Sequence, residues 1–399
     1  MKRWLSLAAI VVLAMALVIG AACGGGEGEE EGVTELKIGQ GLPLTGGYGA
    51  AVGLPAKYAY TLAAEKIGEF EVAGEKYRWK PIFEDNFWSP AGGVSSTMKF
   101  IHEYNVGFMI QQAGSDPGLA AVSICEEVGK ICDVAGASIY SFGPEYPHMF
   151  QIGLTSQFAY APFYHWLTAE HPEVQRVTEV HTEDVIGLAL HEANTACCEH
   201  YGLEYKGFVC PAGTVEWYHM ATKIMASDPD LVVGTSGLFE ALWDRGYEGF
   251  CISSHWTETA GGEVDWGKAA GSVLITGPHP IPGLWPETDA IREEYEHRFG
   301  LELTPAAMWA LCNYFIYTDI LQQAGTVDDV DRIAETMETG TFDSRLVGPV
   351  HYGGEALNGI GHCLLWPSPI YMVVGENEYE VLAIYTPDEV EAIVNEVFK

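Results

Sequence analysis

Short apolar runs alternate with helical stretches along most of the chain. An apolar run at residues 35–39 leads through a Gly- and Pro-rich loop into a helical stretch at 56–67, which carries Ala, Leu and Tyr on one face. A second predicted strand at 80–85 is followed by Ser89-Pro90, which opens a helix reaching Ile101. A repeated order of strand, loop and helix predicts a parallel sheet covered by helices.

The same alternation continues to residue 252. It predicts strands at 106–110, 131–134, 177–180, 207–209, 231–233 and 249–252, and helices at 117–128, 157–170, 187–201, 220–226 and 239–245. From Val273 the pattern changes. Thr304-Pro305 predicts the start of a long helix ending near Gln323, because proline is favoured at the first helical position. A helix at 327–337 and strands at 350–352, 364–366, 370–374 and 381–384 complete the prediction. No short period repeats, which excludes solenoids and propellers.

Length and charge narrow the class of protein. The chain has 399 residues, of which 48% are hydrophobic, which suggests two or three globular units with a large core. It carries 55 Asp and Glu against 20 Lys and Arg, for a net charge of −35. Binding to a phosphate backbone needs clustered Lys and Arg, so we expect no nucleic-acid partner.

The first 33 residues predict export. Lys2 and Arg3 precede an apolar run from Trp4 to Gly20, which is the layout of a signal peptide over 1–22. An uncleaved anchor helix is the alternative, since the run approaches membrane-spanning length. Residues 19–23, Ile-Gly-Ala-Ala-Cys, resemble a bacterial lipobox with Gly20 in the place of the usual Leu, which implies that Cys23 is lipidated. The Gly- and Glu-rich residues 23–33 then form a solvated tether.

Sequence motifs for catalysis or for a nucleotide cofactor are missing. Gly39-Gln40-Gly41 follows a strand, but Leu44 stands where a dinucleotide fingerprint needs its third glycine. The segment 234–237 lacks the spacing of a nucleophile elbow. An enzyme such as an amidase-like hydrolase is therefore a distant alternative, and we expect no enzymatic activity and no cofactor.

The histidines and cysteines raise two questions, whether the chain binds a metal and whether it forms a disulfide. His191, Cys197, Cys198 and His200 lie on one predicted helix without a zinc-ligand spacing, so we expect no metal site there. Eight cysteines follow Cys23, in a compartment that permits disulfides. Cys125, near a helix end, and Cys132, on the next strand, are the best local disulfide pair; two buried thiols are the alternative.

A series of segments in fixed order resembles a known family. The matching segments are 36–39, 42–49, Glu84-Asp85, Ser89-Pro90, 113–115, 126–129, 135–138, 227–233 and 347–350. Together they resemble the branched-chain amino-acid type of ABC transporter substrate-binding lipoprotein. The resemblance spans residues 34–390.

The resemblance implies an architecture and a function. It implies an α/β type I periplasmic-binding-protein fold, in which two Rossmann-like lobes with parallel-sheet cores are joined by a three-segment hinge. Lobe 1 would hold 34–152 and 278–348, and lobe 2 would hold 153–277 and 349–399. Such a protein captures a small solute between its lobes and delivers it to the permease subunits of an ABC importer. We expect an extracytoplasmic monomer, anchored to the membrane by lipid. A ligand-sensing receptor of the same fold is the alternative.

Ligands of open parallel sheets lie outside the carboxyl ends of the strands. In the resembled family the position of Ser115 contacts the ligand carboxylate, with further contacts at Ala137 and Ser138. A helix N-cap is the structural alternative for Ser115. Tyr48 takes an aromatic position at the cleft lip of that family, with a place in the core as the alternative.

Two departures bear on specificity. Amino-acid binders of this type hold the ligand ammonium with a carboxylate aligned near 254–255 and an aromatic near Ile186, and this chain has neither there. His255 and Trp256 offer an imidazole and a flat apolar surface instead. Because an unpaired buried ammonium costs several kcal/mol, we expect a carboxylate-bearing aromatic or short organic acid. A true branched-chain amino-acid binder stays open, as does a packing role for Trp256 with His255 in solvent.

Overall fold

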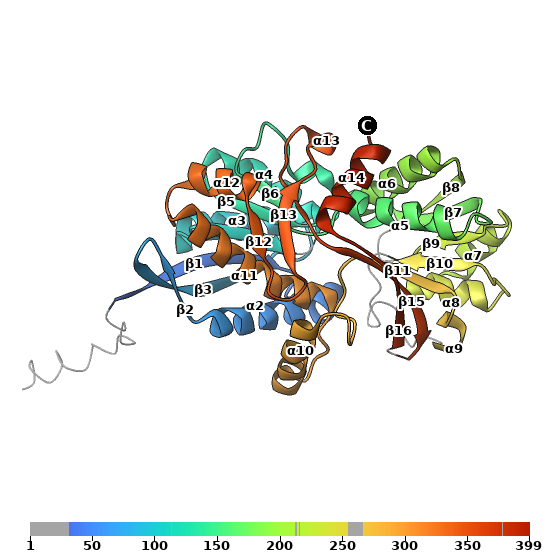
Figure 1. Ribbon diagram of the computed structural model, residues 1–399, viewed down its shortest axis with the longest axis horizontal. Coiled ribbons are helices and arrows are strands. Elements are labelled where there is room, and N and C mark those ends of the chain that lie inside the picture. The colour runs from blue at the N-terminus through green and yellow to red at the C-terminus, as the bar shows by residue number, and fades with distance from the viewer. Residues whose placement is uncertain (1–31, 113, 212–213, 215, 254–265, 377) are drawn as a thin grey trace, which may run out of the picture.

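Two sheets organise the chain into two lobes that lie side by side (Figure 1). The computed structural model describes residues 32–112, 114–211, 214, 216–253, 266–376 and 378–399. The first lobe is built on a nine-stranded sheet of order β12-β13-β14-β6-β5-β4-β1-β3-β2. Its strands are β1 (Val33–Leu42), β2 (Glu69–Val72), β3 (Glu75–Asp85), β4 (Phe108–Gln112), β5 (Ile131–Ala135), β6 (Met149–Gln151), β12 (Thr341–Asp343), β13 (Pro349–Gly353) and β14 (Cys363–Leu365).

The second lobe is built on a seven-stranded sheet of order β16-β15-β11-β10-β9-β7-β8. Its strands are β7 (Arg176–Thr182), β8 (Glu204–Cys210), β9 (Leu231–Val233), β10 (Phe250–Ser253), β11 (Val273–Thr276), β15 (Ser368–Gly375) and β16 (Glu378–Tyr385). Strands β7 to β11 pair in parallel, whereas β15 and β16 are antiparallel additions. The predicted fold class, a type I periplasmic-binding fold with two parallel-sheet lobes, is confirmed.

The chain passes between the two sheets three times: after β6, after β11 and after β14. The expected place of the last passage, 348/349, differs from the structure. β13 pairs with β14, and Cys363 of β14 pairs with Gln151 of β6, so both strands extend the sheet of the first lobe. The chain therefore enters the second lobe between Leu365 and Ser368.

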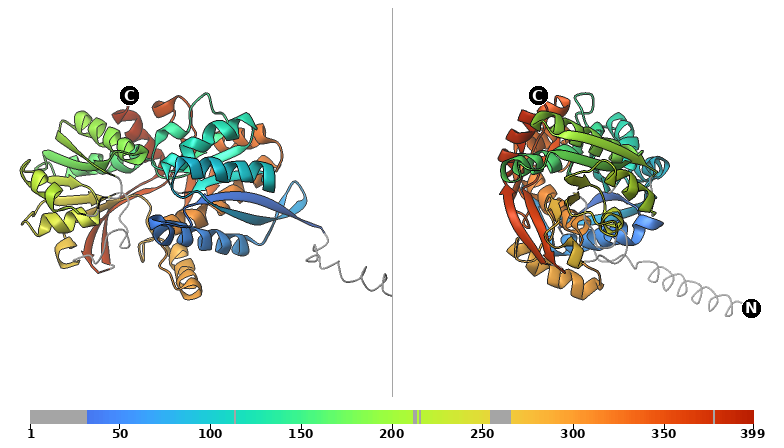
Figure 2. Two further views of the ribbon diagram at one scale, coloured as in Figure 1. Left: turned by 180° about the vertical axis from the view of Figure 1, so that it is seen from behind. Right: turned by 90° about the vertical axis from the view of Figure 1, so that its right-hand side faces the viewer.

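Helices cover both sheets, as Figure 2 shows from two further sides. The first lobe carries α2 (Leu54–Ile67), α3 (Pro90–Lys99), α4 (Ser115–Glu127), α10 (Pro286–Phe299), α11 (Pro305–Ala324), α12 (Val330–Thr339) and the short α13 (Glu355–Asn358). The second lobe carries α5 (Ser156–Glu170), α6 (Val185–Tyr201), α7 (Tyr218–Met225), α8 (Ser236–Trp243) and α9 (Trp266–Ala269), and α14 (Pro387–Val397) contacts both lobes. Shorter turns are η1 (Gly49–Gly53), η2 (Phe100–Tyr104) and η3 (Ile139–Ser141). No helix in these described ranges has both the length and the apolar character needed to cross a membrane.

The long helix α11 confirms the predicted start signal. The Thr304 hydroxyl oxygen accepts a hydrogen bond from the Ala307 N–H at 3.3 Å, with Pro305 as the first helical residue. The helix packs on α2, and the Tyr60 and Tyr314 rings meet between them with centroids 4.9 Å apart. Burial of apolar and aromatic side chains between these helices stabilises the first lobe.

Candidate ligand-binding site

The loops after β1 and β3 are fastened to each other by one carboxylate. Asp85 accepts hydrogen bonds from the Leu44 and Phe87 backbone N–H groups, at 3.0 and 2.9 Å, and from the Thr45 hydroxyl at 2.6 Å. These three hydrogen bonds give a structural reason for the acidic residue at the end of the Glu84-Asp85 segment. A single acidic side chain at the end of β3 sets the conformation of two neighbouring loops that lie at the carboxyl edge of the sheet.

The loops after β4 and β5 meet at Ser115. The Ser115 hydroxyl oxygen accepts a hydrogen bond from the Ala137 N–H at 3.1 Å, and Ser115 is only 2% exposed. A Cβ on Gly136 would lie 2.8 Å from that oxygen, so the close approach requires glycine. The structure thus brings two predicted site residues together at the N-terminus of α4.

The alternative of a helix cap at Ser115 is wrong. The N-cap of α4 is Gly114, with φ at 95°, and Ser115 is the first helical residue. Both polar backbone groups of Ala137 already have hydrogen-bond partners within the protein. Its N–H is bonded to Ser115, and its carbonyl accepts from the Ser156 N–H at 3.0 Å. No group among the residues that the structure describes accepts the Ser115 hydroxyl proton, so this proton can donate to a ligand.

Ser138 opens a turn that reaches the second lobe. Its hydroxyl oxygen accepts from the Tyr140 N–H at 3.2 Å, and Ser138 is buried. The Tyr140 hydroxyl donates a hydrogen bond to Glu192 on α6, and this bond raises the pKa of Tyr140 to about 12. Ser138 therefore anchors one of the contacts that join the two lobes.

Tyr48 is half-exposed rather than part of the core. Its ring stacks on Trp88, with centroids 4.2 Å apart and planes 21° apart. Burial, and after it the negative charge of Asp184 in the second lobe, raise the pKa of Tyr48. The Tyr48 ring therefore lies on the side of the first lobe that faces the second.

Two carboxylates meet where the lobes face each other, and sequence reasoning missed both. Asp116, on the first turn of α4, lies near the Val185 backbone N–H at the start of α6, and these two helices pack against each other. Asp184 caps α6 by accepting from the Gly187 N–H at 3.0 Å. Burial, and after it the charge of Asp184, raise the pKa of Asp116. Cap signals at Asp184 and at the start of α4 were visible in the sequence, but their proximity follows only from the meeting of the lobes.

Of the remaining predicted contacts, only Ile186 lies among the described residues. Ile186 is half-buried in the first turn of α6, next to Val185. His255 and Trp256 lie outside the described residues, as does the lipidation residue Cys23.

The predicted cysteine pair lies side by side in the first lobe. Cys125 of α4 and Cys132 of β5 are buried free thiols in the structure. A hydrogen bond with Cys125, together with burial, raises the pKa of the Cys132 thiol. A disulfide between them stays a prediction.

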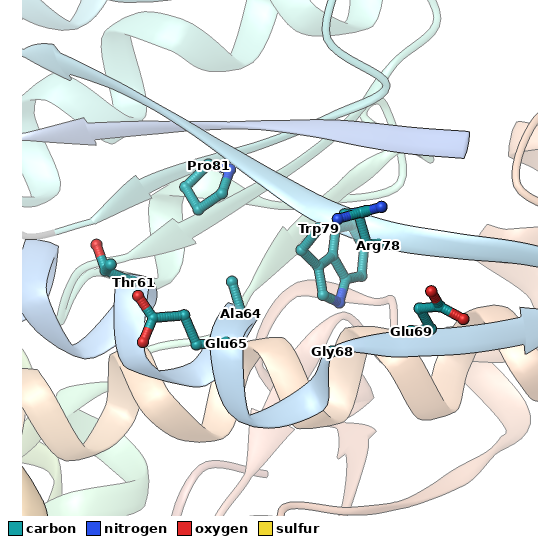
Figure 3. A pocket seen from close by; sticks show the side chains of 8 residues that line it. All are labelled: Thr61, Ala64, Glu65, Gly68, Glu69, Arg78, Trp79 and Pro81. Atoms are coloured by element: carbon teal, nitrogen blue, oxygen red, sulfur yellow. The ribbon is translucent and has the colours of Figure 1, made fainter. Parts of the chain in front are cut away.

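A hollow on the outer surface of the first lobe is separate from this site. Figure 3 shows it between α2, with Thr61, Ala64 and Glu65, and β3, with Arg78, Trp79 and Pro81. None of the loops at the carboxyl ends of β4, β5 and β7 lines this hollow, and we propose no ligand for it.

Comparison with known proteins places the chain in a family. A family model described as periplasmic binding protein matches residues 35–365. No curated protein sequence matches the chain.

Solved structures share the fold over nearly their whole length. A leucine-binding protein, LivK, from Thermotoga maritima superimposes with a TM-score of 0.71 at 18% identity, covering 88% of this chain and 99% of that one. A solute-binding protein from R. palustris in complex with benzoate gives 0.72 at 16%, covering 88% and 97%. Another, from Rhodopseudomonas palustris with 3,4-dihydroxybenzoic acid, gives 0.72 at 16%, covering 88% and 98%. With the matched segment spanning both lobes and their loops, this chain belongs to the periplasmic binding protein family, whose members are extracytoplasmic, bind small solutes and work with ABC permeases.

Proposed function

We propose that this protein is the solute receptor of an ABC importer and that its ligand is a small carboxylate-bearing molecule, such as an aromatic or short organic acid. The observation that carries the proposal is the N-terminus of α4, which begins at Ser115 where the loops after β4 and β5 meet and faces α6 of the second lobe. Binding would be reversible and accompanied by movement of the lobes, with no turnover of the ligand.

The chemistry of this helix end favours an anion. The first N–H groups of a helix have no partner within the helix and carry the positive end of its dipole. The Ser115 hydroxyl proton adds a donor beside them, because its oxygen is already engaged with Ala137. A ligand carboxylate would satisfy both kinds of donor.

The body of the ligand would lie against aromatic surface. Tyr48 and Trp88 present a stacked pair at the lip of the first lobe. An aromatic acid fits such a surface by offset stacking, and two structural neighbours were solved with benzoate and a dihydroxybenzoate.

An amino acid is the second candidate, and one observation favours it. Asp116 and Asp184 supply negative charge opposite the aromatic pair, which is the partner an ammonium group needs. A leucine-binding protein is among the structural neighbours.

Cellular placement completes the proposal. The signal-like residues 1–22 and the lipobox-like residues 19–23 support export and a lipid anchor at Cys23, with the receptor working as a monomer beside its permease. A sensor of the same fold is distinguished by its gene neighbours, which would lack permease and ATPase genes.

A ligand screen tests the function. We expect the melting temperature of the purified protein to rise with benzoates or short organic acids and to stay unchanged with sugars and amides. A ligand at 100 times its Kd adds about 2.7 kcal/mol of stability, which thermal shift detects. Shifts with leucine or valine alone would keep the receptor and overturn the acid specificity; no shift with any solute would contradict the proposal.

The variant Asp184→Asn separates the two ligand classes. Asparagine keeps the cap on α6 and removes one negative charge near the site. For a simple acid we expect affinity to rise about 2- to 5-fold, because the charge repels the ligand carboxylate. A fall in affinity by tenfold or more, measured by calorimetry, would show an ammonium paired with Asp184. Asp328→Asn, in the exposed loop before α12, is the control and should change nothing.

A further inference from the structure

Three side chains of the second lobe converge between β7 and α6. Glu179 and His181 alternate on β7 and so point to the same face, and His191 comes from the second turn of α6. The Glu179 carboxylate oxygen Oε2 lies 3.5 Å from Nδ1 of His181 and 3.5 Å from Nδ1 of His191. The two imidazole rings stack with centroids 4.4 Å apart. All three candidate ligand atoms lie within 4.8 Å of one another.

We propose that Glu179, His181 and His191 form a binding site for Zn²⁺ or a chemically similar divalent transition metal. Imidazole nitrogen and carboxylate oxygen are ligands of zinc at 2.0–2.2 Å, and at the corners of a tetrahedron such ligands lie about 3.3 Å apart. The two distances of 3.5 Å from Glu179 are close to that value. The His191 side chain is 38% exposed, so it has room to turn toward the ion.

His181 provides an independent sign of a ligand. Its Nδ1 faces Glu179 and is buried, and no group within the described part of the chain hydrogen-bonds to it. A buried polar nitrogen left in this state costs about 1–3 kcal/mol. A metal ion would engage its lone pair and remove that cost.

Gly207 on β8 leaves space for the two rings. It pairs with Glu179 in the register of β7 and β8. A Cβ there would lie 3.2 Å from Cε1 of His191 and 3.3 Å from Cε1 of His181. Both histidine rings therefore lie against a position without a side chain, and a Cβ at that position would crowd both of them.

A second layer of residues holds the carboxylate in place. Asn194 donates from Nδ2 to Oε1 of Glu179 at 2.8 Å, and the Tyr164 hydroxyl donates to Oδ1 of Asn194 at 2.9 Å. Glu179 is thereby turned so that Oε2 faces the histidines. Outer partners of this kind orient the ligands of natural metal sites.

The Tyr205 hydroxyl contacts two of the atoms that would bind the metal ion, so it would compete with the ion. This hydroxyl donates to Oε2 of Glu179 and lies 2.7 Å from Nδ1 of His191. Metal binding would replace these two contacts, and the fourth ligand would be water. The bound ion would tie β7 to α6, the helix that Asp184 caps and whose first turn carries Ile186.

Metal titration tests the site without reference to the solute. After treatment with EDTA and its removal, we expect the purified protein to bind one equivalent of Zn²⁺ in calorimetry and in elemental analysis after dialysis. His191→Ala should weaken this binding at least tenfold. Because His191 is partly exposed, the variant should fold, which circular dichroism checks; His191→Gln gives a second variant with a side chain closer in size.

His200→Ala is the matched control, since His200 lies on the same helix, is partly exposed and contacts only Glu396 among the charged groups described. It should bind Zn²⁺ as the parent does. Absence of stoichiometric binding would overturn the site, and so would equal losses in the His191 and His200 variants, which would mean binding to scattered surface histidines.

Discussion

Replacing Asp133 by asparagine is expected to make the protein more stable at pH 8 by about 2–4 kcal/mol and to leave it nearly unchanged at pH 4.5. Asp133 is on β5 in the core of the first lobe and has no exposed surface. Burial raises its pKa to about 7, and the hydrogen bond from the Tyr317 hydroxyl opposes this only in part.

The direction follows from the proton balance. A carboxyl with a raised pKa in the folded state binds a proton there that the unfolded chain has already lost. Its favourable contribution is complete below the unfolded pKa, about 3.9, and is lost as pH rises to the folded value of about 7. Above pH 7 the folded protein carries a buried negative charge, which asparagine avoids with nearly the same shape.

Apart from the Tyr317 hydrogen bond, no group in the described part of the chain compensates this charge with a positive one. The titratable groups that interact with it are hydroxyls and thiols, among them Tyr317 of α11, Tyr352 of β13 and Cys363 of β14. Urea unfolding of parent and variant between pH 4.5 and 8 measures the difference, with Asp328→Asn as the surface control. Parallel curves for parent and Asp133→Asn would contradict the buried charge.

The sequence predicts the local elements of this fold well, because their signals are local. The strand and helix alternation up to residue 252 and the start of α11 depend on side chains within a few positions of one another. Helix α10 escaped prediction, since Pro286–Phe299 is polar around most of its circumference and lacks an apolar period. Helix α14 follows a strand at the end of the chain, and its capping box at Thr386 and Glu389 is a signal that could have found it.

The sequence does not predict to which of the two lobes β13 and β14 belong. Their apolar pattern says that they are strands, but it does not say which sheet they join. That choice depends on the pairing of Cys363 with Gln151, more than 200 positions away. Long-range pairing of this kind leaves no trace in a local pattern.

The two groups of charged residues missed from the sequence share one cause. Asp116 and Asp184 come together only because two lobes meet, and His191 joins Glu179 and His181 only because α6 packs on β7. The expectation of no metal considered His191 only with Cys197, Cys198 and His200 on its own helix. The partners that we propose for His191 lie on the neighbouring strand.

Ser115→Ala is expected to weaken binding of a carboxylate ligand by about 5- to 150-fold, which corresponds to about 1–3 kcal/mol for a lost hydrogen bond to a charged group. The effect should fall on affinity because no group in the described part of the chain accepts the Ser115 hydroxyl proton, while the oxygen accepts from Ala137. Calorimetry with the best acid from the ligand screen measures it.

The same substitution also removes an internal contact, and a matched variant separates the two effects. Ser344 is buried like Ser115, and its hydroxyl oxygen likewise accepts from a backbone N–H, that of Val347 at 3.0 Å. It lies between β12 and β13, at the opposite side of the nine-stranded sheet from β1 and β3. Both variants should lose about 1 kcal/mol of stability or more, with the larger loss for Ser344→Ala because the Ser344 hydroxyl also donates to the Gly348 carbonyl at 2.7 Å. Only Ser115→Ala should lose affinity. Equal affinities for the two variants would remove Ser115 from the site and leave the helix end of α4 without its proposed ligand contact.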